Sequence, residues 1–436
     1  MPRNGESAAP RRAYHRGSES AFSMSMYVAP SPRNPTGRLG LALAGGGPEG
    51  AIYEMGVLRA LDDAFDGVDF NDVPITVGVS AGALVGACLA NGITTAQMCR
   101  SVVHGEPGEQ PFRPELFLSP AAREIGQRLA SVPGLLLGSL ADTARRPRTY
   151  GLVATLIERL SRAVPVGVFD NRPLREYLRR LFAEPGRTDD FRDLANDLIV
   201  VAADLDAGTT VRFGEGPLAE VPISTAIQAS TALPGLYPPV EIDGRHYVDG
   251  VLHKTVHASV ALDRGAELVL CINPIVPVDT VRSVEQGVMQ RGKLVDRGLP
   301  TVMSQTLRTL IHSRLGTGLA AYRERYEGAD VVLFEPSRDD YTMFFVNVFS
   351  FAERKMVMEH AYKSTLRQLS RRRGEVGPVF ARHGITLRTD VLDDPLPDLW
   401  QSIALGRSRG GDAVMPTTVA TRDLRDTLGD LEELLG

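Results

Sequence analysis

One serine of the sequence lies in a setting that could make it a nucleophile. Ser80 is the centre of Gly78-Val-Ser-Ala-Gly82, a G-x-S-x-G sequence. The apolar residues 74–79 before it predict a strand, and the small residues 81–90 after it predict a helix. A serine on such a tight turn is exposed and strained, and the flanking glycines permit the turn. The motif favours acyl transfer through Ser80 over a turn that only packs.

A glycine-rich turn upstream could stabilise the negative charge that develops during acyl transfer. Residues 45–50 read GGGPEG, after the apolar residues 39–44 and before a helical pattern that starts at Ala51. Backbone N–H groups at a glycine turn and a helix start can hold an oxyanion. Pro48 suits the first turn of a helix, where its missing N–H removes no helical bond. We expect the oxyanion donors to be Gly45, Gly46 and Gly47, with Gly50 supporting the turn.

The same glycines leave a second interpretation open, a dinucleotide-binding enzyme. Gly45, Gly47 and Gly50 match G-x-G-x-x-G. That fingerprint also needs an acidic residue about 20 positions further on, at the end of a second strand. The acidic residues near this distance lie in the polar stretch 62–72, and the next strand runs into Ser80. The dinucleotide interpretation is therefore the less favoured one.

A candidate general base lies far along the chain. Tyr247 and Val248 form a short predicted strand that enters Asp249-Gly250. A serine hydroxyl needs a base to become a good nucleophile, and a shielded carboxylate within about 2.6–3.2 Å can serve. Asp-Gly alone predicts only a turn. The later histidines, which we expect to be exposed or hydrogen-bonded rather than catalytic, are His253, His257, His312, His360 and His383. A Ser–Asp dyad is thus favoured over a Ser–His–Asp triad.

The elements that must position these residues alternate between strand and helix. Predicted strands cover 39–44, 74–79, 198–203, 209–213, 247–248, 268–272 and 329–334, and predicted helices follow residue 51, cover 81–90 and 221–231, and recur within 280–330 and 352–372. Continuous apolar strands joined by helices indicate an α/β fold with a mainly parallel sheet that is covered on both faces.

The composition along the chain predicts how it is divided. We expect a disordered N-terminal tail at 1–37, a catalytic domain at 38–275 with a possible lid or insertion at 104–168, a mostly helical extension packed on the core at 276–403, and a linker with a short acidic helix at 404–436. Alternating apolar residues at 22–28 also allow a short docking strand within the tail. The aromatic segment 343–351 could meet a lipid interface, although a buried core segment is favoured.

Charge and cysteine content exclude several functions. The 436 residues carry a net charge of −5, which argues against nucleic-acid binding. Three cysteines at spacings that fit no metal motif favour buried thiols, and we expect no metal site. No window has the roughly 18 apolar residues of a membrane span, nor is there a clear secretory signal. We expect a cytoplasmic or peripheral membrane protein, with secretion by a route without a cleavable signal left open.

Taken together and in this order, the three motifs resemble those of the patatin-like phospholipase family. The resemblance covers about residues 39–275 and includes the segment Ala229–Pro239 ahead of Asp249. It implies a three-layer α/β/α fold, a Ser80–Asp249 dyad with Gly78, Gly82 and Gly250 as supporting motif residues, and hydrolysis of acyl esters in a lipid or phospholipid without a metal or cofactor.

Two residues depart from the family pattern. The family usually carries Arg or Lys where this chain has Glu49, and a small residue where it has Val251. A carboxylate near an oxyanion site would oppose negative charge if it pointed inward. Glu49 therefore keeps an alternative open, a non-catalytic lipid-binding protein with a decayed site.

Overall fold

A mixed sheet runs through the centre of the molecule. The computed structural model describes residues 27–29, 38–103, 112, 114–121, 126, 130, 164–285, 293–296, 298–338, 340 and 351–404. Within this part of the chain the sheet has nine strands, in the order β1 (Tyr27–Ala29), β12 (Asp330–Phe334), β11 (Leu268–Ile272), β2 (Leu39–Leu43), β4 (Ile75–Val79), β7 (Asp197–Asp204), β10 (Arg245–Asp249) and β9 (Val240–Ile242), with β8 (Thr209–Phe213) paired to β7.

The five middle strands, from β12 to β7, run parallel to one another. The remaining strands, β1, β8, β9 and β10, join them or one another in antiparallel pairs. Every residue of β2, β4, β11 and β12 is buried. A parallel strand buried on both faces needs apolar residues throughout, which is why these segments are continuous apolar runs in the sequence.

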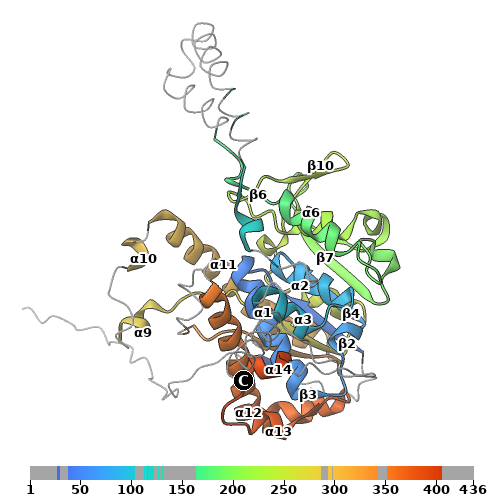
Figure 1. Cartoon of the computed structure of the whole chain (residues 1–436), viewed down its shortest axis with the longest axis vertical. Coiled ribbons are helices and arrows are strands. Elements are labelled where there is room, and N and C mark those ends of the chain that lie inside the picture. Colours follow the sequence, from blue (N-terminus) through green and yellow to red (C-terminus); the bar gives the residue numbers. More distant parts are fainter. Residues whose placement is uncertain are drawn as a thin grey trace, which may run out of the picture.

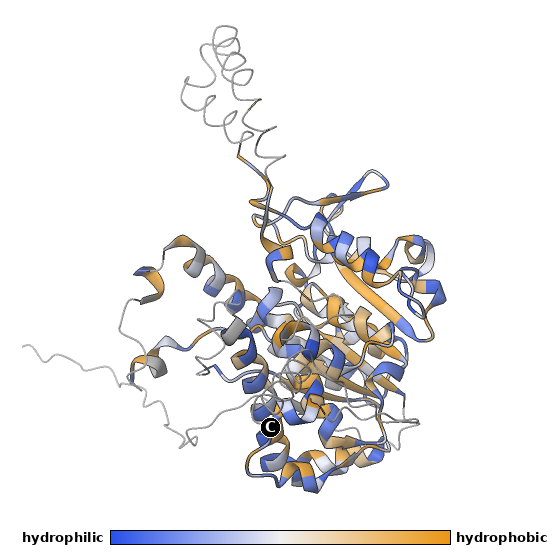
Figure 2. Cartoon of the chain, viewed as in Figure 1, coloured by the Kyte–Doolittle hydropathy of each residue, from blue (hydrophilic) through white to orange (hydrophobic). Residues whose placement is uncertain are grey.

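Alternating side chains of β2 divide the core into two layers. Leu41 and Leu43 face one apolar cluster, and Ala42 and Ala44 face the other. The first cluster is covered by α1 (Gly47–Ala64), α2 (Ala81–Ala90), α3 (Thr95–Val103), α6 (Arg172–Leu181), α7 (Ile223–Ser230) and α12 (Phe351–Arg382), and the second by α8 (Ala258–Asp263) and α11 (Leu299–Arg325). Figure 1 shows helices on both sides of the strands, and Figure 2 shows the central strands mostly in hydrophobic colours. The predicted three-layer α/β/α fold is confirmed.

Most predicted elements are present, with shifted ends. Helix α2 has the predicted bounds, and α1 starts at Gly47 with Pro48 in its first turn. Helix α12 extends ten residues beyond the predicted end at 372, through Pro378. The short elements β9 and α8 were not predicted, and neither were α3 and α6.

Two segments that were predicted to lie outside the central domain contribute strands to its sheet. Within the predicted tail, residues 27–29 form β1, paired antiparallel with β12, which is the docking strand that the alternation allowed. Strand β12 comes from the predicted extension 276–403 and lies inside the central sheet, while α12 packs against α1. The same extension contributes α9 (Thr280–Glu285), α10 (Lys293–Asp296), β13 (Thr386–Leu387), α13 (Thr389–Leu392) and α14 (Leu399–Ala404).

Several predicted segments lie outside the described residues. They are the rest of the tail 1–37, most of the proposed lid 104–168, the aromatic segment 343–350, and the linker and acidic helix from 405 onward. Among the helices that are described, none is both long and apolar enough to cross a membrane.

Candidate active site

Ser80 lies on the turn between β4 and α2, and its backbone conformation is unusual. It has φ of 54° and ψ of −120°. Among the described residues, Asp243 is the only other non-glycine residue with positive φ. Such a conformation costs about 1–3 kcal/mol and persists only where the surrounding structure enforces it. The expectation of an exposed serine is wrong: Ser80 is only 6% exposed, because the strained turn is covered by the surrounding structure.

Gly78 and Gly82 are needed because neither position has room for a side chain. A Cβ on Gly78 would lie 2.5 Å from the Cα of Ala83, and one on Gly82 would lie 2.5 Å from the carbonyl oxygen of Leu43. The N–H of Gly82 also donates to the carbonyl oxygen of Ala44 at 3.0 Å. The two glycines thus allow the start of α2 to pack directly on the end of β2.

Asp249 reaches Ser80 because two strands meet end to end along one edge of β7. Strand β8 occupies the opposite edge over the second half of β7. On the shared edge, β4 pairs in parallel up to Val201, and β10 pairs antiparallel from Ala202 onward. Val79 lies opposite Val201, and Asp249 lies opposite Ala202, the next residue. The last residues of β4 and β10 therefore meet, which brings Ser80 beside Asp249.

The carboxylate of Asp249 is buried and hydrogen-bonded. The residue is 2% exposed, and its Oδ1 accepts a hydrogen bond from the N–H of Val251 at 2.9 Å. Burial raises the pKa of Asp249 to about 7, while the bonds from Val251 and Ser80 oppose that rise. A carboxylate with a pKa near neutrality is well matched to proton transfer at neutral pH.

The glycine turn brings the start of α1 to the same point. A Cβ on Gly45 would lie 3.1 Å from the Cβ of Ser80, so the backbone of Gly45 passes directly beside the serine. Gly47 has φ of 62°, which favours glycine, and the N–H of Gly50 closes the first turn on the carbonyl oxygen of Gly46 at 3.0 Å. The first N–H groups of a helix have no partner within it. The turn therefore offers backbone donors next to Ser80.

Glu49 lies in the first turn of α1, where the family pattern has a basic residue. One of its carboxylate oxygens is 3.9 Å from a guanidinium nitrogen of Arg308 on α11. Burial raises the pKa of Glu49 to about 7, and the positive charge of Arg308 opposes that rise. Near neutral pH this side chain is therefore divided between its neutral and charged forms.

Four of the histidines that follow Asp249 contact groups other than the Ser80 and Asp249 side chains. His257 is buried, and its Nε2 lies 3.4 Å from the carbonyl oxygen of Gly250. Burial lowers the pKa of His257 to about 3, which keeps the imidazole neutral. The further contacts are His312 with Glu335 at 4.0 Å, His360 with Asp340 at 2.5 Å, and His383 with Asp330 at 2.7 Å.

The acidic residues considered for a dinucleotide site are used elsewhere. Asp62 and Asp63 lie in the last turn of α1 and form ion pairs with Arg59. The third candidate, Asp66, ends β3 (Phe65–Asp66), but this strand pairs with β13 in a separate two-stranded sheet and not with the strand before the glycine turn. Among the described residues, no group of three or more His, Cys, Asp or Glu could hold a metal ion.

Two backbone contacts bring the segment 229–239 into the site. The N–H of Ser80 donates to Oγ of Ser230 at 2.7 Å, and the N–H of Asp249 donates to the carbonyl oxygen of Ala232 at 3.0 Å. The sequence indicates this segment only through its resemblance to the family. Nothing in the local pattern marks Ser230, because a serine at the end of a helix is common.

A cavity of about 220 Å³ lies beside α2. Its wall combines apolar with polar and charged side chains, and the residues that line it are Met55, Leu84, Cys88, Ile93, Gln97, Met98, Ser101, Phe112, Tyr177, Leu181, Glu184 and Arg187. Leu84 and Cys88 follow Ser80 by one and two helical turns, so they share a face of α2 with the start of the helix. Ser80 and Asp249 themselves do not line this cavity.

Solved structures similar to this chain include VipD, a type III effector protein and a phospholipase. VipD from Legionella pneumophila is 14% identical, with 89% of this chain and 88% of that chain covered and a TM-score of 0.29. The type III effector protein ExoU is also 14% identical, with 91% and 80% covered and a TM-score of 0.27. Human GIVD cytosolic phospholipase A2 is 11% identical, with 79% and 59% covered and a TM-score of 0.30.

The family assignment comes from a match of the sequence itself. The model of the patatin-like phospholipase family matches residues 41–262, which is slightly more than half of the chain. The matched range contains Ser80, Asp249 and the turn from Gly45 to Gly50, and it ends within α8. The chain belongs to the patatin-like phospholipase family.

Proposed function

We propose that this protein is a serine hydrolase of lipid acyl esters in which Ser80 is the nucleophile and Asp249 the general base. Membership of the family supports lipid hydrolysis. The observation that carries the assignment of residues is the strand register that places a strained serine beside a buried carboxylate whose pKa is raised to about 7. The convergence of β4 and β10 on one edge of β7 keeps the two groups together.

The reaction follows from these positions. The Ser80 oxygen bonds to the ester carbonyl carbon while its proton passes to Asp249, and the carbonyl oxygen becomes an oxyanion. Backbone N–H groups at Gly45, Gly46 and Gly47 stabilise that charge, and each such donor can contribute on the order of 100- to 1000-fold in rate. The ester C–O bond then breaks, and the leaving alkoxide takes the proton from Asp249. Water, deprotonated by Asp249, releases the fatty acid and restores Ser80.

The acyl chain is assigned to the cavity beside α2. Apolar side chains such as Met55, Leu84 and Leu181 line part of its wall, as an acyl chain requires, and Leu84 and Cys88 lie on the helix that follows Ser80. Contact with a membrane surface, from which such a lipid would be taken, is part of the same proposal.

Labelling by a fluorophosphonate probe tests the dyad. We expect the wild type to be labelled, and Ser80→Ala and Asp249→Asn to lose labelling while they remain folded. Ser224→Ala is a matched control, because Ser224 is also buried but bonds to Asp189, away from the site. Labelling that survives Ser80→Ala would reject Ser80 as the nucleophile.

Glu49 favours one other function, lipid binding without hydrolysis. Its carboxylate lies in the first turn of α1, where negative charge would oppose an oxyanion. Binding of phospholipid vesicles by a folded wild type that neither reacts with the probe nor releases fatty acid would favour this second function. Fatty acid release by the wild type, abolished in Ser80→Ala, would dismiss it.

A further inference from the structure

The two strands that carry the site leave a break in the hydrogen-bond ladder of β7. Strand β4 ends at Val79, opposite Val201, and β10 ends at Asp249, opposite Ala202. Backbone groups at such a junction must find partners other than the next strand, because a buried unpaired N–H or C=O is costly. Ser80 directly follows Val79 at this junction, so the groups that bond to the backbone there influence the position of the serine.

The hydroxyl of Ser230 bridges two backbone groups at this junction by hydrogen bonds. Oγ of Ser230 accepts a hydrogen bond from the N–H of Ser80 at 2.7 Å and donates one to the carbonyl oxygen of Val201 at 2.6 Å. Ser230 is fully buried at the end of α7, so water cannot replace it without a rearrangement. Gly250 crosses the same place: a Cβ there would lie 2.6 Å from the carbonyl oxygen of Val201.

We infer that Ser230 is a positioning residue for the nucleophile. It holds the backbone of Ser80 in its strained conformation, with φ of 54°, and so keeps the serine hydroxyl aimed at Asp249. The Ser80 hydroxyl does not cap α2, so its own helix does not fix it. The hydroxyl of Ser230 bonds to the backbone N–H of Ser80 and to the backbone carbonyl oxygen of Val201, so it acts on the nucleophile through the backbone. This inference rests on the proposed role of Ser80.

Replacing the hydroxyl should slow the acylation step without changing substrate binding. In Ser230→Ala we expect kcat and the rate of fluorophosphonate labelling to fall on the order of 10- to 100-fold, because a small misplacement of a reacting group has effects of this size. KM should not change, because the proposed acyl site is untouched. Ser230→Cys, which keeps the volume but is a weak hydrogen-bonding group, should behave like Ser230→Ala.

Two further variants separate positioning from a general loss of stability. Ser230→Thr retains the hydroxyl and should recover most of the rate. Ser224→Ala removes a buried serine hydroxyl from the same helix and should label at the wild-type rate. Folded Ser230→Ala and Ser230→Cys variants that label as fast as the wild type would overturn the inference.

Hydrogen exchange of the Ser80 amide tests the contact independently of turnover. The amide should be protected in the wild type and exchange faster in Ser230→Ala, whereas Ser224→Ala should leave it protected. Fast exchange in the wild type would show that the hydrogen bond from the Ser80 N–H to Ser230 is absent and would overturn the inference. If the wild type does not react with the probe but its Ser80 amide is protected as expected, the proposed function would be rejected. The hydrogen bond between Ser80 and Ser230 would still stand.

Discussion

At the scale of single residues, two carboxyl groups with similar pKa values are expected to have opposite effects on the proposed reaction. Asp249 and Glu49 both have their pKa raised to about 7 by burial. The general base must be a carboxylate, so the labelling rate should increase as the pH rises through about 7. Ionisation of Glu49 over the same range places a negative charge near the oxyanion donors and should limit the rate.

Glu49→Gln separates these two effects. We expect the variant to keep the rise through about pH 7, because that rise belongs to Asp249. Above pH 7 its labelling rate should exceed that of the wild type by up to about tenfold. In the wild type the Glu49 carboxylate lies 3.9 Å from Arg308 and offsets its positive charge; in Glu49→Gln that charge can stabilise the oxyanion. The measurement is the labelling rate from pH 5 to pH 9. A rise that disappears in Glu49→Gln would assign that titration to Glu49 and leave Asp249 without a kinetic signature.

The sequence could single out the residues of the candidate site but not the contacts that arrange them. Ser80, Asp249 and the glycine turn lie in local motifs whose turn chemistry can be read from a few neighbours. Ser230 and Arg308 approach the site through α7 and α11, and no local pattern encodes that approach. Such long-range contacts depend on how whole elements pack, which sequence spacing does not determine.

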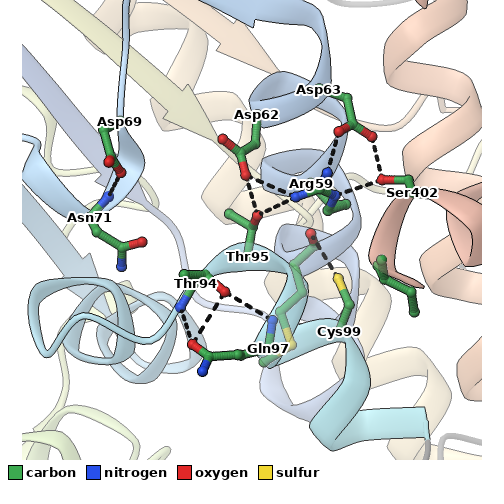
Figure 3. A network of polar contacts seen from close by, with 12 residues as sticks. Arg59, Asp62, Asp63, Asp69, Asn71, Thr94, Thr95, Gln97, Cys99 and Ser402 are labelled. Atoms are coloured by element: carbon green, nitrogen blue, oxygen red, sulfur yellow. Dashed lines mark hydrogen bonds and ion pairs between the residues drawn. The ribbon is translucent and has the colours of Figure 1, made fainter. Parts of the chain in front are cut away.

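At the scale of elements, a polar network attaches the C-terminal helices to the helix that starts at the glycine turn. Arg59 of α1 donates to Asp62 at 3.0 Å and to Ser402 of α14 at 2.7 Å, and it pairs with Asp63 (Figure 3). Asp63 also accepts hydrogen bonds from Ser402 and from Tyr362 of α12, the latter at 2.8 Å. One carboxylate therefore links α1, α12 and α14.

Asp63→Ala should destabilise the protein by about 3–5 kcal/mol, because it leaves a buried guanidinium without one of its charge partners. Arg59 is only 3% exposed, so water cannot substitute readily. Urea unfolding should show a lower midpoint. Glu176→Ala on α6 is the matched control: its ion pairs with Arg179 and Arg180 are exposed, and we expect the midpoint to stay near that of the wild type. Equal midpoints for Asp63→Ala and the wild type would contradict this role.

Strand pairing is the element-scale feature that the sequence left open. The apolar runs of β2, β4, β7 and β11 predicted a parallel sheet, because strands covered on both faces must be apolar throughout. Strand β10 is short, with exposed residues at its start, and its pattern does not reveal that it continues the edge of β7 where β4 stops. That register, rather than the Asp-Gly dipeptide, explains why Asp249 meets Ser80.

At the scale of the whole molecule, the cavity beside α2 depends on elements from separate parts of the chain. Residues of α1, α2, α3 and α6 form most of its wall. No single sequence segment contains it, so it could not be predicted before the packing was known. Because Leu84 and Cys88 of α2 form part of its wall, the size of these side chains sets how much volume the cavity offers to an acyl chain attached to the proposed nucleophile.

Changing the size of Leu84 should therefore change the preferred acyl length. Leu84→Phe adds volume to the wall one turn after Ser80, and we expect its activity on long-chain p-nitrophenyl esters to fall relative to short-chain esters. Leu84→Ala should shift the preference toward longer chains. A fluorophosphonate with a short alkyl group does not need the cavity and should label both variants at the wild-type rate. If both variants hydrolysed esters from acetyl to palmitoyl with the wild-type profile, the acyl chain would have to lie elsewhere, while normal labelling would leave the dyad in place.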